Sequence, residues 1–327
     1  MFFLSSLAFA QESHVRFVVL GDTGEACTSA DPACLDGVAK SALAACTAGV
    51  PCSFGLLLGD NFYETGVRGV KGRIWRKAFH RPFGGFAALP GFHFWAVPGN
   101  HDALTPGSID AEIAHTTSPA NTDGLWRMLP LPYAVEVPTD AASWLHLTGL
   151  DSNPLVNGGA LTLAAPSPGW NLLFAHHLLV SDAEHGQRDG QQRSRLDAAL
   201  APYLGAGKAQ MLISGHDHVA QVLVHPTRKI VQVVEGNSSR SRALCANPDR
   251  AGWTSLWANG EPGDGCRPGP DGPRTTGFMI LDATPTTMGV HAYDWKGCEL
   301  HRDRFTLAAD GTVDVAETAT AETGKCL

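Results

Sequence analysis

The sequence predicts a layered α/β protein, and three features indicate this class. Short apolar runs recur along the chain, and each is closed by glycine or proline. Their hydrophobicity is continuous rather than alternating, which is typical of strands buried on both faces. Between the runs lie segments with apolar residues at i, i+3 and i+4, the pattern of amphipathic helices. Strands and helices therefore alternate for most of the chain.

The expected elements follow one another in a regular order. Strands are expected at 15–20, 54–58, 92–97, 144–150, 171–175 and 210–213, and helices at 35–47, 71–79 and 191–203. From residue 219 onward the pattern becomes β-rich, with strands expected at 221–224, 229–234, 278–282 and 289–293. This second group of strands favours a second sheet packed on the first.

The composition excludes several classes of protein. The chain has 327 residues, of which 44% are hydrophobic and 17% charged, as in a globular protein with a sizeable core. Its formal net charge is −8, and no run of lysine or arginine forms the basic stripe that nucleic acids need. No apolar segment approaches the roughly 18 residues of a membrane span. We expect no nucleic acid as a bulk partner, no membrane span and a monomeric chain.

Residues 1–10 are expected to form a signal peptide. Their apolar stretch ends in Ala8-Phe9-Ala10, the small-x-small pattern of a signal-peptidase site. Only Met1 precedes the stretch, so a positively charged start is missing, and we expect a signal peptide whose beginning is truncated or misassigned. A frayed tail is the alternative. Residues 11–327 are expected to form a single domain that is secreted or periplasmic.

Eight cysteines lie in couples that are close in sequence: Cys27 with Cys34, Cys46 with Cys52, Cys245 with Cys266, and Cys298 with Cys326. No CxxC pair is present, and an even number of cysteines in an exported chain favours disulfides over metal thiolates. Because eight cysteines allow many connectivities, pairing within each couple is a hypothesis based on spacing alone.

Side chains that bind metals follow five of the apolar runs. They are Asp22, then Asp60 and Tyr63, then Asn100, His101 and Asp102, then His176 and His177, and last His216 and His218. A glycine or proline before nearly every cluster lets the chain turn sharply where the strand ends. Because ligands of α/β sheets bind beyond the carboxyl ends of the strands, we expect these clusters to converge.

The residue types in these clusters favour a site with two metal ions. Carboxylate, phenol, amide oxygen and imidazole occur without a thiolate, a set suited to hard or borderline cations. His216 and His218 are two residues apart, so both rings leave the same face of an extended segment. Two imidazoles on one face can serve two metals when a carboxylate such as Asp60 bridges them. The sequence thus predicts a dinuclear hydrolase centre.

The five motifs together resemble those of the metallophosphoesterases and, within them, the small mammalian-type purple acid phosphatases. The family pattern is GDxG, GDxxY, GNH followed by Asp or Glu, a His after a strand, and GHxH; this chain has GDTG, GDNFY, GNHD, AHH and GHDH. GDNFYETGV, WRMLPLPY and AEHG also have counterparts there, and the resemblance runs from residue 15 to about 307. It implies a four-layer αββα sandwich with two mixed β-sheets.

The resemblance also implies a ligand set and a reaction. Asp22, Tyr63 and His218 would hold Fe(III), Asp60 would bridge, and Asn100, His176 and His216 would hold a divalent Fe, Zn or Mn ion, with a bridging hydroxide. Tyr63 favours Fe(III), because a phenol titrates at about 10 and only a strongly Lewis-acidic ion keeps it ionised in acid. The implied reaction is hydrolysis of small phosphomonoesters at acid pH by attack of a metal-bound hydroxide.

Three further residues are expected to act beside the metals. His101 follows a ligand and is expected to face the phosphate, with Asp102 orienting its ring. His185, in the AEHG motif, resembles the catalytic histidine of the family and is suited to protonate the leaving alcohol.

Two adjacent histidines compete for one ligand position. The spacing of nine residues between His176 and His185 matches the family and favours His176 over His177. His177-Leu178 stands where the small enzymes usually have Tyr-Pro, which puts the local substrate contacts in doubt but not the metals.

Two other functions remain open. A phosphodiesterase or nucleotidase of the same superfamily, using zinc or manganese, is the alternative enzyme. A secreted metal- or phosphate-binding protein without turnover is the alternative of another class. Tyr63 packed in the core, or His185 alone at the surface, would weaken the resemblance to the purple acid phosphatases.

Residues 237–276 are expected to form an irregular loop insertion, because they are dense in glycine, proline and arginine. Trp253 and Trp257 would either form an aromatic rim for the leaving group or bury the loop against the sandwich. Arg240 and Arg242 are expected to lie in solvent, and contact with the remote side of the substrate is the alternative.

Overall fold

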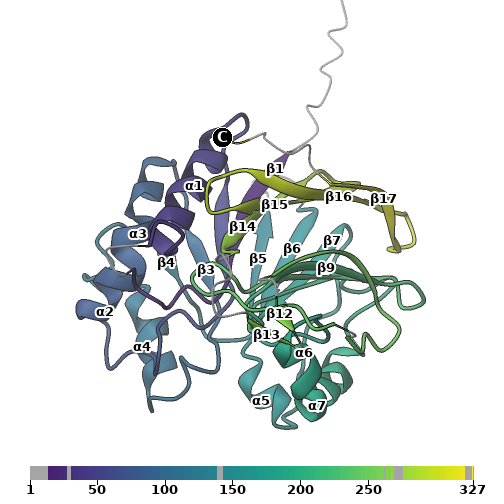
Figure 1. Cartoon of the computed structure of the whole chain (residues 1–327), viewed down its shortest axis with the longest axis horizontal. Coiled ribbons are helices and arrows are strands. Elements are labelled where there is room, and N and C mark those ends of the chain that lie inside the picture. Colours follow the sequence, from purple (N-terminus) through teal and green to yellow (C-terminus); the bar gives the residue numbers. More distant parts are fainter. Residues whose placement is uncertain are drawn as a thin grey trace, which may run out of the picture.

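Two mixed β-sheets form the centre of the molecule in the computed structural model (Figure 1), which describes residues 14–27, 31–137, 143–246, 248–260, 263–264, 266–268, 275–320 and 326. The first sheet consists, in spatial order, of β17 (Val313–Thr320), β16 (Glu299–Leu307), β15 (Thr287–Asp294), β14 (Gly277–Ala283), β1 (Val15–Leu20), β2 (Phe54–Leu57), β3 (Phe94–Ala96) and β4 (Trp126–Arg127). The second consists of β11 (Thr254–Asn259), β9 (Ala220–His225), β10 (Ile230–Glu235), β8 (Met211–Ser214), β7 (Trp170–Ala175), β6 (Leu145–Gly149) and β5 (Tyr133–Val137).

Parallel strands form one side of the first sheet, up to the edge strand β4, and the middle of the second sheet. Strands β1 to β4 run parallel to their neighbours, as do β6, β7, β8 and β10. The other pairs are antiparallel, including the small separate ribbon of β12 (Gly263–Asp264) and β13 (Arg267–Pro268).

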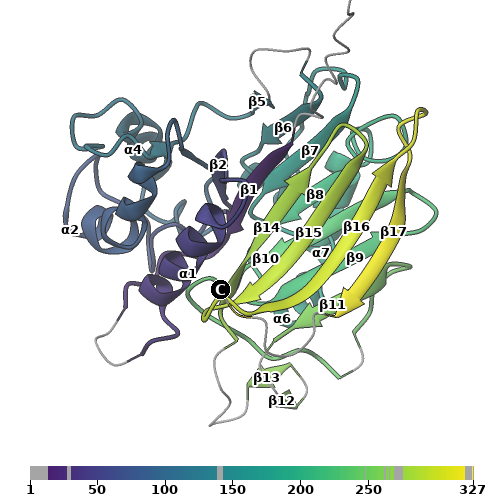
Figure 2. The same cartoon turned by 90° about the horizontal axis from the view of Figure 1, so that it is seen from above.

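Helices cover the outer sides of both sheets. The first sheet is covered by α1 (Leu35–Thr47), α2 (Arg73–Trp75), the π-helix η1 (Arg76–His80), α3 (Arg81–Phe83), the 3₁₀ helix η2 (Gly84–Ala88) and α4 (Ser108–His115). The second sheet is covered by α5 (Asn153–Val156), α6 (Glu184–Arg188) and α7 (Gly190–Leu200). Figure 2 shows that the first group of helices lies beside β1 and β2, whereas β16 and β17 extend away from it.

Alternation along the central strands explains why they are apolar throughout. In β1, Phe17 and Val19 point into the core between the two sheets, while Val18 and Leu20 pack against the helices. A third core lies between the second sheet and its helices. Since both faces of such a strand are buried, apolar residues follow one another, as they do from Phe17 to Leu20. The expected four-layer αββα architecture with two mixed sheets is confirmed.

The structure agrees with most of the expected elements and adds others. β1 and α1 have the predicted bounds, whereas the helix expected over 71–79 is divided into α2 and η1. β16 and β17 were not predicted. Their outward-facing residues are mostly exposed, so these strands lack the continuous apolar run that marks the buried ones.

The segment expected to be irregular contains a regular edge strand. Within it, β11 pairs with β9 at the side of the second sheet. Trp257 on this strand stacks on His301, with ring centroids 5.1 Å apart and planes 2° apart, and Trp253 is buried in the outer core. The two tryptophans therefore bury the segment and do not form a rim around the site.

All four predicted cysteine couples form disulfides in the structure. Four disulfides are typical of a protein that folds in an oxidising, extracellular compartment. The expected signal peptide, residues 1–10, lies outside the described residues. Among the helices of the described part, none combines the length and apolar character needed to cross a membrane.

Candidate metal centre

The predicted ligands lie beyond the carboxyl ends of parallel strands in both sheets. Asp22 follows β1, Asp60 and Tyr63 follow β2, and Asn100 follows β3; His176 follows β7, and His216 and His218 follow β8. Because the two sheets pack face to face, these strand ends meet. The backbone N–H of His216, from the second sheet, donates to Asp22 of the first at 2.8 Å.

Local backbone geometry directs three of these side chains. Asp22, Asp60 and His216 have φ angles of 57°, 50° and 70°, in the left-handed region that residues with a Cβ rarely adopt. Such conformations cluster at functional sites, where the surrounding structure holds them. The glycines of the motifs let the loops that carry the ligands approach one another closely. A Cβ on Gly99, for example, would lie only 2.2 Å from Asp60 Oδ1.

Asp22, Tyr63 and His218 meet on one side of the site. The Tyr63 hydroxyl lies 3.0 Å from Asp22 Oδ1 and 3.1 Å from His218 Nε2. His218 Nε2 lies 3.3 Å from the same Asp22 oxygen. Asp22 is fully buried, and its second oxygen accepts the backbone hydrogen bond from His216.

Asn100, His176 and His216 meet on the other side. His176 Nε2 lies 2.9 Å from Asn100 Oδ1 and 3.1 Å from His216 Nδ1. Asp60 lies between the two sides, with Oδ1 3.4 Å from His176 Nε2. Asp22, Asp60 and His176 each offer a ligand atom within 4.8 Å of the other two. The structure therefore brings all the predicted ligands into one cluster.

Two ring nitrogens of this cluster point at each other. His176 Nδ1 donates to the Leu58 carbonyl at 2.9 Å, so Nε2 points into the cluster. His216 Nε2 faces Asp189 Oδ2 at 3.3 Å, so Nδ1 points toward His176 Nε2, which lies 3.1 Å away. An imidazole binds a metal through the lone pair of its deprotonated nitrogen, and both of these nitrogens face the cluster. The donor set fits hard or borderline metal ions.

The ionisation of two side chains depends on this setting. Burial raises the pKa of Tyr63 well above its usual value, and the charges of Asp22 and Asp60 raise it further. Without a cation, Tyr63 is therefore a neutral phenol. Burial also raises the pKa of Asp22, but the hydrogen bond from His218 and the charge of His176 outweigh it and hold the pKa below its ordinary value. The cluster thus keeps a carboxylate ready for a metal.

His101 lies at the mouth of the cluster, with 28% of its side chain exposed. Its Nε2 is 3.9 Å from Asp60 Oδ2, and its ring meets that of Tyr63 edge-on at 4.8 Å. Nδ1 lies 2.6 Å from the Glu64 carbonyl oxygen, which fixes the ring and leaves Nε2 facing the site.

The expectation that Asp102 orients the ring of His101 is wrong. The Asp102 carboxylate is fully buried and accepts hydrogen bonds from the backbone N–H groups of Asn61, Phe62 and Gly99 at 3.0, 3.0 and 2.8 Å. These bonds tie the loop after β2 to the loop after β3. Asp102 therefore positions the loop that carries Asp60, because the short turn after Asn100 directs its side chain inward.

His176, rather than His177, faces the other candidate ligands. His177 Nδ1 lies 2.8 Å from the Ser152 hydroxyl, away from Asp60 and Asn100. Burial, reinforced by the charge of His176, lowers the pKa of His177 to about 3, so its ring is neutral. His177 packs between its neighbours as an uncharged wall of the site.

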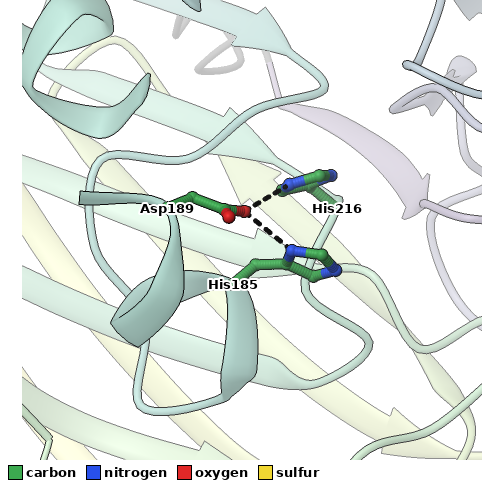
Figure 3. Close-up of side chains that lie close together, drawn as sticks. All are labelled: His185, Asp189 and His216. Carbon is green, nitrogen blue, oxygen red and sulfur yellow. Dashed lines mark hydrogen bonds and ion pairs between the residues drawn. The ribbon is translucent and has the colours of Figure 1, made fainter. Parts of the chain in front are cut away.

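His185 is held beside the cluster by a residue that the motifs did not indicate. Figure 3 shows Asp189 between His185 and His216, with one carboxylate oxygen directed at both rings. Asp189 Oδ2 lies 2.7 Å from His185 Nδ1 and 3.3 Å from His216 Nε2, and the two rings are 4.1 Å apart. The only sequence signal for this contact was the spacing of four residues, which places His185 and Asp189 on the same face of a helix.

The Asp189→Asn variant is expected to bind the divalent metal about 10–100-fold more weakly, the usual effect of removing a carboxylate that orients a ligating histidine. The reason is that Asp189 holds the proton of His216 on Nε2 and so keeps Nδ1 free. Titration of the metal-free protein with zinc measures this affinity. Asp197→Asn serves as the control, because Asp197 is an exposed residue of α7 that pairs with Arg228. Equal zinc affinities in the two variants contradict this role of Asp189.

Arg240 was expected in solvent but lies against the site. Its guanidinium stands 3.8 Å from the centroid of the Tyr63 ring and pairs with Glu25 and Glu64. Arg242 pairs with Glu184 and places its Nε 3.4 Å from His218 Nδ1. The sequence gives no signal for such contacts. Arg240 and Tyr63, for example, lie more than 150 residues apart in the chain.

The fold and the cluster define the class of protein. The chain belongs to the calcineurin-like phosphoesterase family, whose family model matches residues 15–220. This range contains all the predicted ligands and the parallel strands that carry them. The family resemblance drawn from the motifs is confirmed.

Similar proteins include purple acid phosphatases. Over 145 residues the chain is 25% identical to purple acid phosphatase 4 of Arabidopsis thaliana, and the match covers 43% of this chain but only 35% of that protein. The structure resembles purple acid phosphatase PPD1 from yellow lupin seeds, with a TM-score of 0.53, 13% identity, and 96% of this chain and 55% of that chain covered.

It also resembles GAP50, the anchor in the inner membrane complex of Plasmodium, with a TM-score of 0.61, 14% identity, and 96% of this chain and 90% of that chain covered. A further likeness is to PhoD, with a TM-score of 0.54, 11% identity, and 95% and 73% of the two chains covered. At such identities, the structural likenesses show the fold alone.

Proposed function

We propose that this protein is a dinuclear metal-dependent acid phosphatase that hydrolyses small phosphomonoesters. The observation that carries the proposal is the meeting of seven acceptor side chains, with the Tyr63 oxygen among them. In this proposal, Asp22, Tyr63 and His218 hold Fe(III), Asn100, His176 and His216 hold divalent Fe, Zn or Mn, and Asp60 bridges. The proposed ions fit the oxygen and nitrogen donors present.

The chain's own residues supply the remaining parts of the reaction. When bound, the metal ions polarise an ester oxygen and activate water as the nucleophile. His101 presents Nε2 at the mouth of the cluster, where it can donate to a phosphoryl oxygen. Burial lowers the pKa of His185, but the hydrogen bond to Asp189 outweighs it and raises the pKa. His185 therefore holds a proton for the leaving alcohol in mildly acidic solution.

Metal reconstitution tests the proposed reaction. Protein loaded with iron and zinc is expected to contain two ions per chain and to hydrolyse p-nitrophenyl phosphate faster than bis(p-nitrophenyl) phosphate, with an optimum in acid. Faster hydrolysis of the diester favours a phosphodiesterase or nucleotidase of the same superfamily. No hydrolysis of either ester with two ions bound identifies a binding protein without turnover.

The Tyr63→Phe variant is expected to lose the visible charge-transfer colour of the iron-loaded protein. Phenylalanine keeps the ring that packs against His101 and Arg240 and removes only the oxygen beside Asp22. An absorption spectrum of the purified, iron-loaded variant measures the colour. Tyr203→Phe, which removes a hydroxyl bound to the Leu161 carbonyl, is the control and should remain coloured. Colour that survives in Tyr63→Phe contradicts the phenolate assignment.

We also propose that the protein acts as a monomer in the periplasm or outside the cell. The four disulfides support an oxidising compartment. Fractionation of the producing cells, together with gel filtration of the released protein, tests both statements.

A further inference from the structure

A basic segment lies next to the candidate metal centre. Residues 68–77 contain five lysines or arginines and no acidic residue, in a chain whose formal net charge is −8. They are Arg68, Lys71, Arg73, Arg76 and Lys77. All are exposed except Lys77, which is half-buried. Within the described part of the chain, none of the five side chains makes an ion pair.

The segment is anchored by its one aromatic residue, Trp75. Trp75 is 1% exposed, stacks on His115 at 3.7 Å and meets Phe62 edge-on at 4.4 Å. Its indole N–H donates to the Gly69 carbonyl at 2.9 Å. Because Trp75 anchors α2 and η1 in the core, packing fixes the backbone that carries the neighbouring basic residues.

Two of these cations line a cavity that adjoins the metal centre. The cavity has a volume of about 460 Å³, and Arg73, Ile74 and Lys77 are among its lining residues. The other lining residues are Tyr63, Glu64, Arg240 and residues 24–26. The Tyr63 hydroxyl contacts Asp22 of the cluster, so the cavity and the candidate metal centre share this side chain.

The charges of the lining leave two cations without partners. Arg240 is paired with Glu25 and Glu64, which compensate its charge and hold it over the Tyr63 ring. Arg73 and Lys77 lack such partners among the described residues. An arginine fork and a lysine ammonium together suit the several oxygens and the double charge of a phosphate group.

We propose that this cavity binds a second phosphate group of the substrate, so that the preferred substrates are small phosphomonoesters with another phosphate, such as sugar bisphosphates. The inference rests on the proposed phosphatase function and specifies its substrate class. A cavity of about 460 Å³ suits a small molecule rather than a polymer. The basic segment around it raises the local concentration of polyanions, although the whole chain is acidic.

Substrate preference tests the inference. For the metal-loaded wild type, kcat/KM for fructose 1,6-bisphosphate is expected to exceed that for fructose 6-phosphate about tenfold or more. In the Arg73→Gln/Lys77→Gln variant this ratio is expected to fall about tenfold, the effect of losing one or two hydrogen bonds to a charged group. The control, Arg302→Gln/Arg304→Gln, removes two exposed charges from the outer face of β16 and should retain the wild-type ratio. A ratio unchanged in the Arg73→Gln/Lys77→Gln variant overturns the proposal.

A binding measurement separates this inference from the phosphatase proposal. If the metal-loaded wild type hydrolyses no phosphomonoester, the proposed function fails, and calorimetry with the same two sugars then tests the cavity. Tighter binding of fructose 1,6-bisphosphate than of fructose 6-phosphate, lost in the Arg73→Gln/Lys77→Gln variant, supports the second phosphate site. Equal affinities of the wild type for both sugars overturn it.

Discussion

The Asp60→Asn variant is expected to lose at least one metal ion per chain and more than about 10³-fold in kcat. This exceeds the 10–100-fold effect typical of a residue that only supports a ligand. Asp60 offers an oxygen within 4.8 Å of ligand atoms from both Asp22 and His176, so it joins the two sides of the site. An amide keeps the shape of the side chain but removes the charge that we propose bridges two cations.

Elemental analysis and turnover of p-nitrophenyl phosphate measure the two effects in the Asp60→Asn variant. Asp314→Asn is the matched control, because Asp314 is exposed and pairs with Lys229 at the surface. Asp60→Asn protein that retains two ions and wild-type turnover would remove the basis for a dinuclear centre. Loss of one ion with full turnover would show that a single metal suffices.

The His185→Asn variant is expected to lose about 10²–10⁴-fold in kcat/KM with alkyl phosphates, the usual contribution of a general acid. With activated aryl phosphates the loss should be much smaller, because a phenolate leaves without a proton. The geometry motivates this prediction: Asp189 accepts from His185 Nδ1 at 2.7 Å, which leaves Nε2 as the proton donor. The plot of log kcat/KM against leaving-group pKa should therefore become steeper.

Metal content distinguishes this role of His185 from a structural one. His185→Asn is expected to keep both ions, since His185 is not among the proposed ligands, whereas a collapse of the neighbouring His216 would release one. His225→Asn, on β9 and distant from the cluster, is the control. An equal loss with alkyl and aryl phosphates argues against proton donation by His185.

The order of the fold could be predicted because its signals are local. Phe17 to Leu20 are all apolar because one face of β1 meets the other sheet and the opposite face meets the helices. The candidate ligands follow directly after buried strands, so they could be recognised from short sequence segments without knowledge of distant packing. β16 was not predicted because two residues on its buried face, His301 and Asp303, are polar. Their side chains pair inside the protein, with His301 Nε2 3.1 Å from Asp303 Oδ2.

The contacts of Asp102 and Asp189 could not be predicted from the motifs. Asp102 belongs to the GNHD motif, and adjacency suggested contact with His101, but its carboxylate turns inward to the backbone of Asn61 and Phe62. Asp189 belongs to no motif, yet it contacts both His185 and His216. Sequence proximity decides which residues share a loop, whereas the direction of a side chain depends on what packs around it.

The sequence alone determined the class of the protein, the cysteine couples and the identity of the clustered polar residues. Each of these depends on short segments, in which the apolar runs, the glycines that follow them and the residue spacing can be recognised directly. Only the tertiary structure decided which ring of the His176–His177 pair faces Asp60, and which cations stand beside Tyr63. Those contacts join strand ends of two different sheets. They arise when the sheets bury their apolar faces against each other, and no local pattern encodes that registration.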